Sequence, residues 1–148
     1  MSDGSDRMRE ILFMAKRTDD GGWVTGYVTR IKHLDEEGKV ERYYFNALSE
    51  SGWVAECVVS AESVCQFTGY EAIRRKKVFE HNIVFCEDNQ HFGHVVSKDG
   101  AFLIEWERSG DYLRQDIHFW FAERRMYVVG NIFDNPELMK GKEAEYEQ

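Results

Sequence analysis

Two histidines three residues apart, His91 and His94, are the strongest metal-ligand candidates in the sequence. Imidazole is a common ligand for zinc, and such a pair would supply half of a tetrahedral site. On a strand, however, residues three apart project from opposite faces, so the two rings would converge only across a bend. No cysteine or carboxylate pair at recognisable spacing completes a ligand set. We therefore expect both histidines to be surface or loop-lining residues, with no metal bound.

Three cysteines, Cys57, Cys65 and Cys86, are the candidate nucleophiles, with His81 as a candidate base. Nothing in the sequence marks an activated thiol, such as a helix N-terminus or a Cys-x-x-Cys pair. Each cysteine lies in an apolar, strand-like run, and the number of cysteines is odd. This pattern predicts buried, reduced thiols in a cytosolic protein, because an unpaired cysteine behaves as a small hydrophobic residue.

Glu105 and Glu107 share one face of an alternating run and form a candidate acid–base pair. On an amphipathic strand they are more simply the solvated side, opposite Phe102, Ile104 and Trp106. The sequence contains no phosphate-binding loop, no Gly-x-Gly-x-x-Gly, no Gly-x-Ser-x-Gly and no His-Glu-x-x-His motif. We therefore expect no catalytic residues and no cofactor, and we interpret the chain as not being an enzyme.

One concentrated basic run, preceded by an aromatic residue, is the candidate contact for nucleic acid. These residues are Tyr70, Arg74, Arg75, Lys76 and Lys77. Cations beside an aromatic ring can bind a phosphate backbone while a base stacks on the ring, as small β-barrels do. The alternative is a solvated loop, and the net charge of −8 favours it, because proteins that neutralise many phosphates are usually basic.

The sequence predicts that the elements positioning these residues are mainly β-strands. Turn signals rich in Gly, Asp, Asn and Ser recur along it, separating apolar runs. The expected strands span residues 11–16, 23–31, 40–48, 53–59, 64–69, 78–84, 92–96, 101–107 and 126–133. This pattern predicts a mainly β fold of antiparallel strands, either a barrel or two small sheets.

Two local signals are specific. Asp99-Gly100 between two apolar runs predicts a hairpin with a two-residue turn. Asn135-Pro136-Glu137 predicts the start of a short C-terminal helix, with Asn at the N-cap and Pro at the first helical position. Residues 117–125 remain ambiguous between a strand and a short helix.

The 148 residues, 43% of them hydrophobic, suffice for one domain with a real core. We expect residues 1–7 to be a disordered leader, residues 8–139 a single domain with two lobes at about 8–60 and 61–139, and residues 140–148 a frayed tail. The first residues lack the apolar segment of a signal peptide, and no apolar run approaches the length of a membrane span. The expected location is the cytoplasm, with no membrane partner.

Three sets of motifs, in order along the chain, resemble a known family. They are Met8-Arg9-Glu10-Ile11-Leu12-Phe13 with Trp23-Val24 and Gly26-Tyr27; Gln66-Phe67-Thr68-Gly69 with Val78-Phe79-Glu80 and Ile83-Val84; and Val128-Val129-Gly130-Asn131-Ile132-Phe133-Asp134-Asn135-Pro136-Glu137-Leu138. Together they span residues 8–139, and they are similar to the YopX family of phage and prophage proteins.

This resemblance implies a mainly β fold with an SH3-like barrel element, a phage or prophage origin in a bacterial host, and no established biochemical activity. It implies no catalytic residues. The chain departs from the family in its middle motif, where His81-Asn82 stands in place of the usual Gly-Asp pair.

The favoured function is a non-catalytic binding or assembly protein with a protein partner, and the alternative is a nucleic-acid-binding accessory protein. Two apolar runs, residues 53–59 and 126–129, contain no lysine or proline to protect an exposed strand edge. A second copy of the chain would cover such an edge, so we expect a homo-oligomer, although a closed barrel would also solve the problem.

Overall fold

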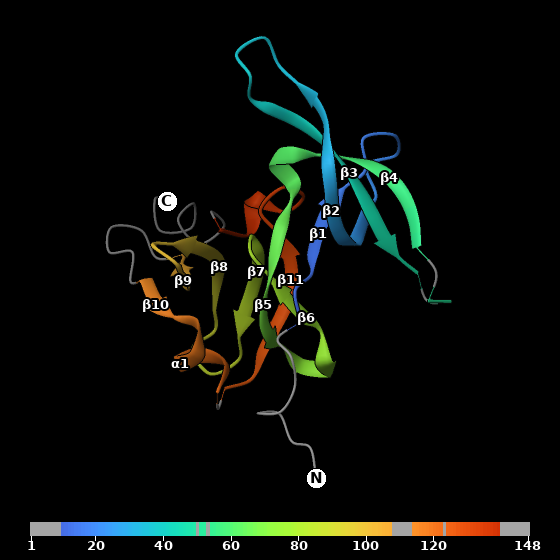
Figure 1. The fold of residues 1–148 in the computed structure, drawn as a ribbon. Helices are drawn as coiled ribbons and strands as arrows, with labels where there is room; N and C mark the ends of the chain where they lie inside the picture. Colours follow the sequence, from blue (N-terminus) through green and yellow to red (C-terminus); the bar gives the residue numbers. More distant parts are fainter. Residues whose placement is uncertain (1–9, 50, 53, 108–113, 123, 140–148) are drawn as a thin grey trace. The chain divides into compact units, whose positions relative to one another are not determined.

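The computed structural model describes residues 10–49, 51–52, 54–107, 114–122 and 124–139 (Figure 1). The chain forms two compact units, Met1–Phe67 and Thr68–Gln148. The division falls inside one strand, so that strand belongs to both units. The expected leader at residues 1–7 and tail at residues 140–148 lie outside the described residues.

The first unit is an antiparallel sheet with the order β4-β3-β2-β1-β5. Its strands are β1 (Phe13–Lys16), β2 (Trp23–Leu34), β3 (Val40–Leu48), β4 (Val54–Ser60) and β5 (Cys65–Glu71). A single 3-10 turn, η2 (Ala61–Ser63), joins β4 to β5. The long β2–β3 hairpin continues past the short strand β1, whose pairing with β2 covers residues 23–26 (Figure 1).

The second unit contains a five-stranded antiparallel sheet with the order β10-β9-β8-β7-β11. Its strands are β7 (Asn82–Cys86), β8 (His91–Lys98), β9 (Ala101–Trp106), β10 (Arg114–Asp116) and β11 (Met126–Asn131). Before this sheet, the turn η3 (Ile73–Arg75) leads into β6 (Lys77–Phe79), which is the neighbour of β5. A short helix, α1 (Ile117–Phe121), and a 3-10 turn, η4 (Pro136–Met139), complete the described elements.

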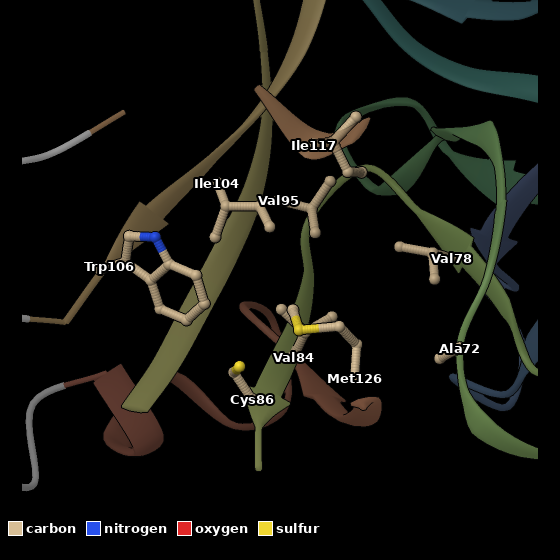
Figure 2. Packing of buried hydrophobic residues seen from close by; sticks show 9 residues of the cluster. All are labelled: Ala72, Val78, Val84, Cys86, Val95, Ile104, Trp106, Ile117 and Met126. Carbon is tan, nitrogen blue, oxygen red and sulfur yellow. The ribbon is translucent and has the colours of Figure 1, made fainter. Parts of the chain in front are cut away.

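Each unit has its own apolar core, built from alternate residues of its strands. In the first unit, Ala15, Phe45 and Val59 are fully buried. Figure 2 shows the second core, where side chains from several strands and α1 converge around Val84, Val95 and Ile104. Burial of such side chains stabilises each unit by roughly 1.5–3 kcal/mol per large residue.

The predicted mainly antiparallel β fold is confirmed. A closed barrel is not detected among the described residues, although an isolated bridge between Arg17 and Val59 brings the chain after β1 to the edge strand β4. The Thr18 amide also donates to the Val58 carbonyl at 3.1 Å. The SH3-like barrel element therefore stays a prediction.

The predicted Asp99-Gly100 hairpin is confirmed. Lys98 pairs with Ala101, and both turn residues have positive φ, 52° for Asp99 and 83° for Gly100. Two positive φ values are the signature of a type I′ turn, whose twist matches that of the flanking strands.

The ambiguous stretch begins as a helix because Asp116 caps it. The Asp116 carboxylate accepts a hydrogen bond from the His118 amide at 2.8 Å, and α1 spans Ile117–Phe121. The expected C-terminal helix is a 3-10 turn at Pro136–Met139. Asn135 precedes this turn, and its main-chain carbonyl accepts from the Leu138 amide at 3.1 Å, while its side-chain Oδ1 accepts from the Asn131 amide at 3.2 Å.

Candidate functional site

The structure brings together two histidines that the sequence placed in separate motifs. His81 Nδ1 and His94 Nε2 lie 2.9 Å apart and share a hydrogen bond, and the rings are tilted at 35°. Phe133 packs edge-on against His81, and the Glu80 carboxylate lies 3.8 Å from the opposite nitrogen of that ring. The candidate base His81 is therefore engaged with His94.

Burial lowers the pKa of His94 from its ordinary 6.5 to about 4. The largest cause is the desolvation of the imidazolium, and the charge of His81 acts in the same direction. Glu105, the cross-strand neighbour of His94, opposes the shift. His94 is thus held neutral over most of the pH range.

His81 stands where the family resemblance implies a glycine, and its backbone has a conformation that suits a glycine. Its φ is +71°, in the left-handed region that glycine adopts most easily. The next residue, Asn82, accepts a hydrogen bond from the Phe79 amide at 2.8 Å through its side-chain oxygen, as an aspartate would. The departure from the family motif therefore preserves the turn.

His91 does not join His94, because the two side chains project from opposite faces of β8. His91 Nδ1 lies 3.2 Å from Glu107, which also accepts from the Phe92 amide at 3.3 Å. Glu107 was expected on the solvated face, and this was wrong: it is only 3% exposed. Strand β9 ends at Trp106, and the chain then turns so that the Glu107 carboxylate points inward to satisfy these donors.

The described residues contain no group of three or more His, Cys, Asp or Glu side chains placed to hold a metal. The three cysteines are buried, as expected, and none forms a disulfide. Burial raises the pKa of the Cys57 thiol, which opposes formation of a nucleophilic thiolate.

The basic run does not form one continuous loop beside a bare aromatic ring. Arg74 and Arg75 are exposed in the turn η3, and Arg75 lies 3.6 Å from Glu71. Lys77 already belongs to β6. The Tyr70 ring packs against His118 and Phe121, and its hydroxyl lies 3.0 Å from His118 Nδ1.

A surface pocket of about 510 Å³ lies at the turn end of the β2–β3 hairpin in the first unit. Three carboxylates and two cations line it, among other residues. Two of these carboxylates already serve the hairpin: Asp35 accepts from the Lys39 amide at 2.8 Å, and Glu41 lies 3.0 Å from His33. The mixed charge and these internal bonds single out no ligand.

The most distinctive surface is one face of the first unit's sheet, opposite its core. The register places Trp23, Tyr27 and Tyr44 there, since their strand neighbours Val24, Val28, Tyr43 and Phe45 belong to the core. Cations stand over these rings: Lys16 Nζ is 5.7 Å from the Trp23 centroid, and the Arg30 guanidinium is 3.9 Å from that of Tyr44. We call this surface the aromatic–cationic face; its residues are Lys16, Trp23, Tyr27, Arg30, Lys32 and Tyr44.

Sequence reasoning missed this face because the alternation along β2 is interrupted. The register with β3 shifts between Val28 and Arg30, so that Arg30 returns to the face of Tyr27. Such a β-bulge re-aims the following side chains. The alternation of Trp23, Thr25 and Tyr27 was the signal available before the bulge.

The same sheet has an open edge at β4. Beyond its pairing with β3, the backbone of β4 pairs, among the described residues, with Arg17 and Thr18 alone, at Val59 and Val58. Val54, Ala55 and Glu56 are exposed. Trp53, which was expected to begin this strand, lies outside the described residues.

No helix within the described residues is long and apolar enough to cross a membrane. None of the curated proteins compared with the chain matches it. The fold is similar to that of protein EF1440 from Enterococcus faecalis, with a TM-score of 0.51 and 18% sequence identity, over 89% of this chain and 99% of that chain. At this identity the similarity shows the fold alone. The family model of the YopX protein matches residues 14–140, and the chain therefore belongs to the YopX family.

Proposed function

We propose that this chain is a non-catalytic binding protein that assembles with a second copy of itself through the open edge of β4. The observation that supports the proposal is the outer edge of β4 at residues 54–57, which pair with β3 on one side and, within the described residues, with no strand on the other. Unpaired amides and carbonyls along a strand edge pair readily with another strand. A two-fold axis would join two β4 strands antiparallel and extend both sheets.

Side chains beside this edge favour such a contact. Leu48 and Val54 are cross-strand neighbours, and they are 43% and 48% exposed. Glu56, the one charged residue in the open stretch, lies 3.5 Å from Arg30, which compensates its charge. Pairing two edges would remove apolar surface from water at about 25 cal/mol per Å².

The other edge strand that the sequence singled out, β11, is a weaker candidate. The turn η3 lies against β11 within the second unit. Like β4, β11 has an exposed apolar side chain, that of Val129, which is 41% exposed. We therefore assign the assembly contact to β4 and use β11 as the control.

Two further features belong to this proposal. The Arg17–Val59 bridge supports an SH3-like barrel element in the first unit. Membership of the YopX family supports a phage or prophage origin and a role in the cytoplasm of the bacterial host.

Light scattering after size-exclusion chromatography tests the assembly. At 1–100 µM we expect a mass that rises toward twice the chain mass of 17.4 kDa. Val54→Lys places a charge on the exposed edge and should give a folded monomer, whereas Val129→Lys should leave the dimer intact. A mass of one chain at every concentration, or a dimer that survives Val54→Lys, would contradict the proposal.

A further inference from the structure

We infer that the aromatic–cationic face of the first unit binds single-stranded nucleic acid, with bases stacked on its rings and phosphates held by its cations. This inference does not depend on the assembly through β4. It also differs from the expected contact at residues 74–77, because it uses a different unit and different residues.

The rings supply a stacking surface. Trp23 and Tyr27 lie on β2 four residues apart, a separation of roughly 13 Å along an extended strand. Tyr27 is 42% exposed, and Tyr44 on the neighbouring strand continues the row. Single-stranded nucleic acids are bound without sequence preference when successive bases stack on aromatic side chains of a sheet.

The cations are interleaved with the rings. Lys16 stands beside Trp23, while Arg30 and Lys32 stand beside Tyr44, with Lys32 Nζ 5.6 Å from its centroid. A guanidinium stacked on a ring extends the flat surface available to a base and brings a positive charge close to the phosphates.

The local charge is complementary to a phosphate backbone although the chain is acidic. The register adds Arg42 to the same face, making four cations with Lys16, Arg30 and Lys32. Two carboxylates accompany them: Glu56 beside Arg30, and Glu41 beside His33, the cross-strand neighbour of Arg42. Four positive and two negative charges leave a surplus of two, against −8 for the whole chain.

Unpaired bases explain this composition better than other partners. A duplex hides its bases in the stack and would leave the rings without a function. An acidic peptide would use the cations alone. The exposed ring of Tyr27, the half-buried rings of Trp23 and Tyr44 and the cations have a common use only if the partner offers flat bases and phosphates together.

Fluorescence anisotropy of a labelled twelve-residue oligo(dT) at 20 mM salt tests the inference. We expect binding that weakens with a slope of about −2 in log affinity against log salt, because about three cations meet phosphates. Tyr27→Ala should weaken binding about tenfold, as expected for the loss of one stacked base. Tyr27→Phe keeps the ring and should bind like the unchanged chain, and Lys32→Glu should weaken binding and flatten the salt slope.

One control locates the contact. The double variant Arg74→Ala, Arg75→Ala should bind as the unchanged chain does. Far-UV circular dichroism and the thermal midpoint verify that each variant folds. No anisotropy change up to 100 µM protein would overturn the inference. So would a loss confined to the Arg74, Arg75 variant, or equal binding of a labelled poly-glutamate peptide.

Discussion

At the scale of single residues, Glu107 is a buried charged residue with a structural role. Its carboxylate is buried between His91 and the Phe92 amide, at 3.2 and 3.3 Å. A buried donor left without its acceptor costs its full desolvation penalty. Glu107 therefore serves to end β9 and fix the first residues of β8.

Replacing Glu107 by alanine should lower the free energy of unfolding by about 2 kcal/mol, since it leaves two partly buried groups, the His91 ring and the Phe92 amide, without their acceptor. Urea denaturation followed by tryptophan fluorescence measures the change. Asp88→Ala, at an exposed carboxylate in the same unit, should change it by less than about 0.5 kcal/mol. Equal effects of the two variants would show that the Glu107 contacts do not stabilise the fold.

His94 gives a prediction about pH. Its folded-state pKa of about 4 lies below the ordinary 6.5, so the unfolded chain takes up a proton in a range where the folded chain does not. This residue therefore causes stability to be lost as the pH falls from about 6.5 to about 4.

Titration of the His94 ring protons by NMR should give a midpoint near pH 4. Replacing His81 by asparagine removes one of the charges that depress the pKa of His94 and should raise the midpoint. A midpoint close to 6.5 in the unchanged protein would mean that the ring is solvated and that the His81 contact does not hold in solution.

At this scale the sequence predicted the burial of the cysteines but neither histidine pairing. Local alternation correctly separates His91 from His94, because it depends only on the geometry of one strand. The partners of both rings come from outside that strand: His81 lies at the turn before β7, and Glu107 follows β9. Such non-local contacts leave no spacing to recognise.

At the scale of elements, Gly26 marks a close approach of β2 to β3. A Cβ atom built on Gly26 would overlap the carbonyl oxygen of Asn46, which is backbone and cannot move aside without breaking the ladder. The glycine is thus required by the close approach of the two strands.

Gly26→Ala should lower the free energy of unfolding by about 3 kcal/mol, at the upper end of overpacking costs. Gly38→Ala, in the open turn of the same hairpin, meets no atom and should cost only about 1 kcal/mol, for its positive φ of 88°. Thermal denaturation of the two variants compares them. If Gly38→Ala proved the more damaging, the pairing of β2 with β3 would be incorrectly assigned.

Strand positions and the Asp99-Gly100 hairpin were predictable because alternation and turn chemistry are local properties. The β-bulges between β2 and β3 were not, since they depend on how two strands fit together. The aromatic–cationic face therefore appears only when the register is known.

At the scale of the whole molecule, the sequence predicted family membership from three motifs in order and predicted a homo-oligomer, but it could not tell which of the two runs, residues 53–59 or 126–129, would form an open edge. Whether an edge strand is open depends on what the rest of the chain leaves uncovered. In this fold β4 is a sheet edge, and its residues 54–57 extend beyond the bridge to Arg17. The proposed function depends on assembly through that edge.

Hydrogen–deuterium exchange at 1 µM and 100 µM, read by mass spectrometry, tests this claim most directly. Amides in a peptide covering residues 54–57 should exchange more slowly at the higher concentration, because pairing with a second copy gives them partners. A peptide covering β11 should exchange at the same rate at both concentrations. Equal exchange of the β4 peptide at both concentrations, or slowing confined to β11, would contradict assembly through β4.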